Sequence, residues 1–192
     1  RRALAARGMV EAVTWSFLPR DQARAFGGGT DALELQNPIS ADLSSMRPSL
    51  LPGLLTAVER NRNRGLADAA LFELGQAYRG DSENEQFVAV SGVRAGTARV
   101  AGMGRHWDGK AEPVTEFDAK ADVAAVLTAL GLDAGKVQIT RDAPAWFHPG
   151  RSATYRLGPK VVLAHFGEVH PDTLRAVDAA GPVVAFELFL DA

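Results

Sequence analysis

The sequence contains no cysteine. Disulfide bonds and cysteine–zinc sites are therefore excluded, and this suits a reducing compartment, so we expect a cytoplasmic protein. Long hydrophobic runs are also missing, because the most apolar stretch, residues 183–190, is short and is interrupted by Glu187. No positively charged leader precedes an apolar segment. We therefore expect neither secretion nor a membrane-spanning segment.

Charge of one sign does not dominate either. Lysine and arginine total 21 against 23 aspartate and glutamate residues. A domain that binds phosphate backbones by itself carries a net positive charge, so any nucleic-acid contact is expected to be local or supplied by a neighbouring domain. The 192 residues fit one ordinary globular domain, and 46% of them are hydrophobic. Because the sequence opens with Arg1-Arg2, we expect a segment of a longer polypeptide.

Hydrophobic periodicity predicts an α+β fold with a mainly antiparallel sheet, since strands are interrupted by separate helices without regular alternation. Strands are expected at residues 10–17, 32–35, 69–78, 86–93, 153–157, 161–166 and 183–190. Helices are expected at residues 1–8, 19–25, 49–65, 123–130 and 172–177. Residues 94–112 have a weak, glycine-bearing pattern and are expected to be mostly loop.

Two carboxylates, Glu73 and Glu187, interrupt apolar strands. A carboxylate at such a position points into a polar cleft or needs a partner, because desolvating it alone is unfavourable. One interpretation is a pair of acid–base or ligand-orienting groups. The favoured interpretation is that each lies on a solvated face or pairs with an arginine such as Arg47 or Arg151.

The four histidines are His106, His148, His165 and His170. One hypothesis is a metal-dependent hydrolase in which His148, His165, Glu168 and His170 hold the ion. Their spacing is not the i, i+4 pair of a helical zinc motif. The favoured interpretation is that His148 and His170, which each precede a proline, order turns through local hydrogen bonds, with no metal bound.

Tyr78-Arg79-Gly80-Asp81 places an arginine at the end of a predicted strand, before an acidic residue and a polar loop. This resembles the second motif of class II synthetases, in which the arginine fork holds the α-phosphate of ATP. The alternative is an exposed arginine that enters a hairpin loop. A serine-nucleophile elbow, a P-loop and a dinucleotide fingerprint are all absent from the sequence.

Several short segments that are spread along nearly the whole chain are informative when they are taken together and in order. They are Gln36-Asn37-Pro38-Ile39-Ser40, Met46-Arg47-Pro48-Ser49-Leu50-Leu51-Pro52-Gly53-Leu54-Leu55, Asn61, Leu71-Phe72-Glu73-Leu74-Gly75, Trp146-Phe147-His148-Pro149-Gly150-Arg151-Ser152-Ala153, Gly167-Glu168-Val169-His170-Pro171 and Phe186-Glu187-Leu188. In this order they resemble the β subunit of phenylalanyl-tRNA synthetase. The resemblance implies a class II aminoacyl-tRNA synthetase-like fold, an antiparallel sheet flanked by helices, as one domain over residues 1–192.

This sequence also differs from catalytic synthetase subunits at positions that hold the substrates. The catalytic subunit has a Phe-His-Gln-Val-Glu-Gly-like strand that holds the amino acid, and the equivalent here is residues 87–92, with Ala89 and Ser91 at the glutamine and glutamate positions. The third class II motif needs an arginine for the γ-phosphate, and residues 184–190 contain none. Losing these groups removes several kcal/mol of transition-state stabilisation. The sequence therefore predicts a synthetase scaffold without catalytic residues of its own.

The resemblance also implies partners. We expect packing against a catalytic α subunit in an (αβ)₂ assembly and support of tRNA(Phe) aminoacylation, with ATP and magnesium used by the assembled enzyme and no cofactor in this domain. The loops at residues 81–84 and 94–107 are candidate partner contacts. The alternative is an active class II ligase that forms an acyl-adenylate with Arg79 on ATP.

Overall fold

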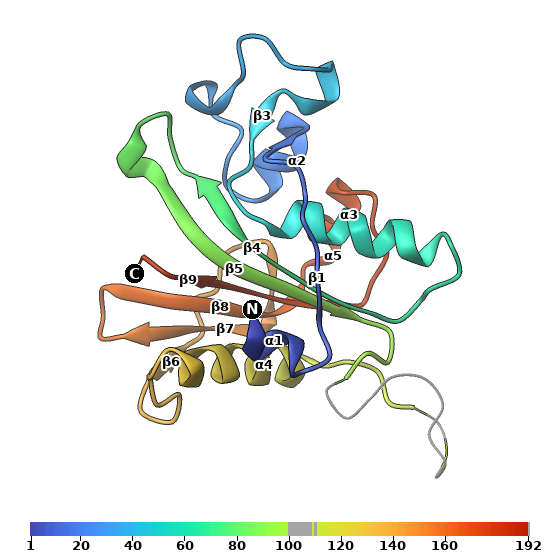
Figure 1. The fold of residues 1–192 in the computed structure, drawn as a ribbon, viewed down its shortest axis with the longest axis vertical. Helices are drawn as coiled ribbons and strands as arrows, with labels where there is room; N and C mark the ends of the chain where they lie inside the picture. Colours follow the sequence, from blue (N-terminus) through green and yellow to red (C-terminus); the bar gives the residue numbers. More distant parts are fainter. Residues whose placement is uncertain (100–108, 110, 192) are drawn as a thin grey trace.

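A seven-stranded sheet forms the middle layer of the computed structural model, which describes residues 1–99, 109 and 111–191 (Figure 1). His106 and residues 100–107 of the predicted partner-contacting loop lie outside these residues. The strands, in sheet order, are β1 (Val10–Glu11), β4 (Ala69–Tyr78), β5 (Gln86–Ala95), β9 (Val183–Phe189), β8 (Val161–Val169), β7 (Phe147–Leu157) and β6 (Gln138–Thr140). Only β1 and β4 pair in parallel. The predicted mainly antiparallel sheet is confirmed.

Helices cover both faces of this sheet (Figure 1). One face carries α3 (Leu51–Arg62), together with α2 (Arg20–Ala25) and α5 (Pro171–Ala176). The other carries α4 (Glu116–Ala129), against which α1 (Arg2–Ala5) packs. Each face has its own buried apolar cluster. Three 3₁₀ turns, η1 (Asp31–Leu33), η2 (Ala41–Leu43) and η3 (Glu83–Glu85), and a small second sheet of β2 (Phe17–Leu18) with β3 (Ser45–Met46) complete the described part.

The two long helices follow from their sequence signals. Leu51, Leu54 and Val58 of α3 fall on one stripe and are fully buried, and Pro52 is tolerated in the first turn. Helix α4 begins with a capping box, in which the Thr115 backbone N–H donates to the Asp118 carboxylate at 2.8 Å. It ends before Gly131, which has a positive φ of 86°.

Some predicted elements differ from the structure. Residues 10–17 form two short strands in different sheets, with Val13 and Trp15 exposed between them, so the apolar run does not mark one half-buried strand. Residues 32–35 lie in and after η1, and Glu34 makes only an isolated bridge to Ser45. The predicted loop begins later, because β5 continues to Ala95. Among the described residues no helix is long and apolar enough to cross a membrane.

Candidate functional site

A row of polar side chains crosses the sheet on one face. Register places Glu73 of β4 opposite Ser91 of β5, Ser91 opposite Glu187 of β9, Glu187 opposite His165 of β8, and His165 opposite Thr154 of β7. Directly opposed residues share a face of a sheet. On β4, β5 and β9 the row lies on the face covered by α3, because Leu71, Val93 and Ala185, each two residues from a member of the row, lie in or against the cluster of that face.

Glu73 is held in a buried ion pair. Arg47 Nη1 donates to Glu73 Oε1 at 2.8 Å, and Thr14 Oγ1 donates to Glu73 Oε2 at 2.7 Å. Arg47 Nε also donates to the Gln76 carbonyl at 2.9 Å. A Cβ added at Gly75 would lie 2.8 Å from Arg47 Nη2, so glycine leaves room for the guanidinium. The predicted arginine partner of Glu73 is confirmed.

For Glu187 the predicted arginine partner is wrong. Ser49 Oγ donates to Glu187 Oε1 and Trp146 Nε1 donates to Oε2 at 2.9 Å, in a site where Glu187 is only 3% exposed. Arg151 instead pairs with Glu168 at 2.6 Å, because β8 lies between β7 and Glu187. Burial raises the pKa of the Glu187 carboxyl, and the two hydrogen bonds oppose that rise only in part.

His165 sits beside this carboxylate in the row. Its Nδ1 lies 2.8 Å from Thr154 Oγ1, and its ring meets Phe189 edge-on with centroids 5.6 Å apart. Burial lowers the pKa of His165 from 6.5 to about 4, so the imidazole is neutral at pH 7. Ser91, between Glu73 and Glu187, is fully buried and its hydroxyl has no hydrogen-bond partner among the described residues.

A second cluster joins the ends of β7 and β8. The His148 and His170 rings stack with centroids 6.2 Å apart. His148 Nδ1 accepts from the Gly150 backbone N–H and His170 Nδ1 from that of Asp172, each at 3.1 Å, and Pro171 then opens α5. The predicted turn-ordering role of both histidines is therefore confirmed. Within residues 1–99, 109 and 111–191 no group of three or more histidine, aspartate or glutamate side chains is placed to hold a metal ion.

The remaining predicted site positions are not members of the polar row. Asn37, Pro38 and Asp81 are exposed in loops, and Pro149 is exposed next to His148. The Asn61 side-chain amide donates to the Ala57 carbonyl at 2.9 Å within α3. The contact of Asn61 therefore lies within its own helix.

Arg79 lies at the mouth of a cleft over the end of the β4–β5 hairpin. The cleft has a main cavity of about 520 Å³ and a neighbouring one of about 300 Å³, which share Arg79, Phe87, His165 and Phe189. The Arg79 guanidinium stacks over Phe87, 4.3 Å from the ring centroid. The interpretation of Arg79 as an exposed arginine at a hairpin loop is confirmed, and the stacking is an addition that the sequence did not predict.

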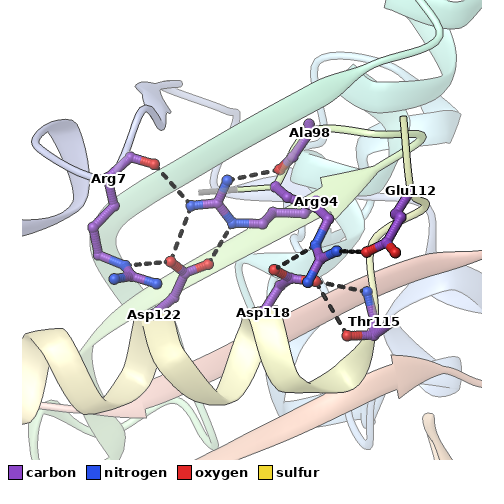
Figure 2. A network of polar contacts seen from close by, with 8 residues as sticks. Arg7, Arg94, Ala98, Glu112, Thr115, Asp118 and Asp122 are labelled. Atoms are coloured by element: carbon purple, nitrogen blue, oxygen red, sulfur yellow. Dashed lines mark hydrogen bonds and ion pairs between the residues drawn. The ribbon is translucent and has the colours of Figure 1, made fainter. Parts of the chain in front are cut away.

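Sequence reasoning missed the largest buried ionic network (Figure 2). Asp122 of α4 accepts hydrogen bonds from Arg94 of β5 and from Arg7, which follows α1. Next to it, Arg99 pairs with Asp118 and Glu112. The available signal was the i, i+4 spacing of Asp118 and Asp122 beside the apolar stripe of α4. This network tethers α1, β5 and the residues near 98 to α4.

Taken together, the polar groups of the row are engaged in structural contacts. Glu73 and Glu187 are each bonded on both oxygens, and the strand positions Ala89 and Ser91 carry small side chains. Strand β9 contains no arginine. This arrangement can hold a sheet and a helix layer together, while the cleft near Arg79 is lined by aromatic groups and by cations that pair with no carboxylate of the described residues.

The fold has a solved counterpart. A pyrrolysyl-tRNA synthetase from Desulfitobacterium hafniense is similar with a TM-score of 0.70, covering 99% of this chain and 63% of that one at 16% sequence identity. At that identity the likeness concerns the fold alone. It confirms the predicted class II synthetase-like fold.

Sequence comparison gives nearer relatives. Phenylalanine–tRNA ligase β subunits of Brucella suis biovar 1 and Mesorhizobium japonicum are 57% and 55% identical over 192 residues, which is 100% of this chain and 24% of each relative. The chain thus spans about a quarter of the length of these curated relatives. The family model described as the phenylalanyl-tRNA synthetase beta chain CLM domain matches residues 1–190. The chain therefore belongs to the phenylalanyl-tRNA synthetase β-chain CLM domain family.

Proposed function

We propose that residues 1–192 form one non-catalytic, synthetase-like domain of a phenylalanine–tRNA ligase β subunit. In this role the domain packs against a catalytic α subunit, supports an (αβ)₂ assembly and thereby supports aminoacylation of tRNA(Phe) in the cytoplasm. ATP and magnesium are used by the assembled enzyme, and this domain carries no cofactor. The family membership and the identity to β subunits support this assignment.

The observation that carries the proposal is the occupied polar row. A catalytic carboxylate has to remain available to substrate, whereas Glu73 is bonded to Arg47 and Thr14 in a site 3% exposed. Glu187 lines the neighbouring cavity of about 300 Å³, but it is 3% exposed and its two oxygens accept from Ser49 and Trp146. Electrostatic catalysis depends on preorganised donors aimed at the developing charge. The described residues of β9 offer no arginine for that purpose.

An exposed apolar segment supports a packing role. Val13 is 90% exposed and Trp15 is 69% exposed, between β1 and β2. They border a groove of about 330 Å³ lined also by Leu18 and Arg47. Large exposed apolar side chains next to a groove are typical of interaction sites. We assign this segment to the contact with the α subunit.

Pyrophosphate exchange tests the non-catalytic assignment. This chain alone, given ATP, magnesium and phenylalanine, should show no exchange. The competing proposal, an active class II ligase, is favoured by one observation, the Arg79 guanidinium free of any carboxylate among the described residues. Exchange that Arg79→Ala abolishes would support that ligase and refute the non-catalytic role.

A pull-down with the matching α subunit tests the assembly role. The expected result is a stable complex that aminoacylates tRNA(Phe), with little activity when the complete β chain is left out. Full aminoacylation by the α subunit alone would contradict the proposal.

A metal-content measurement separately tests the hydrolase hypothesis, which needs a stoichiometric ion at His148, His165, Glu168 and His170.

A further inference from the structure

The cleft beside Arg79 combines free positive charge with an apolar wall. Arg79 and Lys160 both line the main cavity, and neither forms an ion pair with a carboxylate in the part of the chain that the structure describes. Phe189, Val161 and Val162 line the same cavity. Other arginines of the chain, such as Arg20 and Arg47, are paired with carboxylates. Arginines without a carboxylate partner among the described residues, such as Arg60 and Arg64, also occur elsewhere on the surface, so this cleft is distinguished by the combination of its two cations with an aromatic and aliphatic lining.

The guanidinium of Arg79 is oriented before any ligand arrives. Its carbon lies 4.3 Å from the centroid of Phe87 and 5.8 Å from that of Phe189, and the two rings meet edge-to-face with centroids 5.7 Å apart. Stacking on an aromatic face leaves the in-plane N–H donors of an arginine available. Those donors match the two oxygens of a carboxylate in a bidentate geometry.

The charges of the cleft favour a single negative charge on the ligand. Asp191 lines the same cavity and is fixed by the Val88 backbone N–H, which donates to its carboxylate at 2.6 Å. With Arg79, Lys160 and Asp191 among the residues that line it, the described lining carries one net positive charge. A triphosphate or a dianionic phosphate would bring more negative charge than this lining balances.

The apolar wall of the cavity favours a ligand whose remaining part is flat and uncharged. Phe189 is backed edge-on by His165, whose ring is held by Thr154. Val161 and Val162 complete this side of the cavity. A cavity of about 520 Å³ is in the range of small-molecule sites, which are mostly apolar with a few oriented polar groups.

We propose that this cleft binds a small aromatic monocarboxylate, with the carboxylate on Arg79 and Lys160 and the ring against Phe189, Val161 and Val162. This binding site goes beyond the proposed function, because it requires neither catalysis nor contact with the α subunit. Its ligand is bound without being converted.

Methyl NMR of the assembled protein tests the proposal. The sample is the complete polypeptide that carries these residues, with any subunit that copurifies, labelled at valine methyl groups, and the probe is 3-phenylpropionate. The expected result is a saturable shift of the Val161 and Val162 signals. Phenethylamine, which has the same ring but a positive charge, should leave these signals in place.

Variants separate this cleft from any other site in the assembly. Arg79→Ala should weaken binding at the Val161 and Val162 signals at least about tenfold, because a charge-assisted bidentate contact is lost. Arg79→Lys should give an intermediate loss. The matched control is Arg64→Ala, since Arg64 is exposed just after α3 and lines neither cavity of the cleft. Unchanged methyl spectra without probe establish that each variant is folded.

Several outcomes would overturn the proposal. These are no saturable shift at Val161 and Val162, a shift that Arg79→Ala leaves unchanged, or equal binding of phenethylamine. Tighter, Arg79-dependent binding of AMP than of 3-phenylpropionate would identify a nucleotide site in its place. None of these results bears on packing against the α subunit, so failure here is distinguishable from failure of the proposed function.

Discussion

Arg94 and Asp122 face each other through two hydrogen bonds, of 2.6 Å from Nε and 3.0 Å from Nη2, where both side chains are almost completely buried (Figure 2). Arg7 adds a third bond to the same carboxylate at 2.6 Å. Arg94 also donates to the carbonyls of Ala98 and Arg7. One carboxylate on α4 therefore holds the end of α1, strand β5 and the turn after it in one arrangement.

Asp122→Asn is expected to lower the free energy of unfolding of this chain by about 3–5 kcal/mol, because two guanidinium groups would then face a neutral amide in a buried site. Urea unfolding of the 192-residue chain measures the change. Asp133→Asn is the matched control, since Asp133 is exposed, pairs with the exposed Lys136 and accepts from the Gly135 backbone N–H through an oxygen that asparagine keeps, and it should change stability by less than about 0.5 kcal/mol. Equal effects of the two substitutions would show that the buried pair does not stabilise the fold.

The sequence predicted those parts of the fold whose pattern is local. The strand at residues 69–78 was predicted with its observed bounds, since apolar runs flanked by turn residues identify a buried strand. The run at residues 10–17 was predicted wrongly, because its division between two sheets depends on β4 and β3, which lie far along the chain. Periodicity carries no information on such long-range pairing.

In the candidate site, too, the local requirement was predictable from the sequence and the long-range partner was not. An arginine such as Arg47 or Arg151 was predicted as a possible partner of Glu73, because a buried carboxylate needs a compensating charge, and Arg47 is the one that supplies it. The same rule failed at Glu187, where two neutral donors satisfy the carboxylate from 138 and 41 residues away. Composition indicates that a buried charge needs a partner, but only the packed layers decide which side chain supplies it.

Val13→Ser and Trp15→Ser are expected to weaken binding of the α subunit, in accordance with the proposed contact segment. Truncating an exposed tryptophan that becomes buried in an interface removes about 2 kcal/mol or more, so Trp15→Ser should raise the dissociation constant by at least about tenfold. Titration of the α subunit by calorimetry measures this. Ile39→Ser is the control, since Ile39 is 77% exposed on a different loop and should leave binding unchanged. If Ile39→Ser weakened binding as much as Trp15→Ser, the contact would have to be reassigned.

The His165 imidazole is expected to titrate at about pH 4, because burial disfavours its charged form. An unfolded histidine takes up a proton near pH 6.5, so the unfolded state binds more protons between pH 6.5 and 4 and stability falls as the pH is lowered through that range. The two pKa values together give a loss of about 2 kcal/mol between pH 7 and pH 5. His165→Asn, which keeps a polar atom near Thr154, should remove this loss. Histidine NMR titration measures the pKa directly, and a value near 6.5 would refute the prediction.

Glu187 is expected to produce the opposite dependence on pH. Its pKa is raised from 4.5 by burial, so the folded state holds its proton to higher pH than the unfolded state does. The folded state then binds more protons above pH 4.5, and stability falls as the pH rises until the raised pKa is passed. Glu187→Gln cannot ionise, and its amide can still accept from Trp146 and donate to Ser49.

The stability of Glu187→Gln relative to the unsubstituted chain should therefore be greater at pH 8 than at pH 4. Urea unfolding at both pH values gives this difference, and the exposed Glu83→Gln is the control with no expected change between them. A relative stability that is the same at pH 4 and pH 8 would mean that Ser49 and Trp146 fully compensate the buried charge. In that case Glu187 would be an ionised carboxylate at neutral pH, held by two neutral donors without any cation.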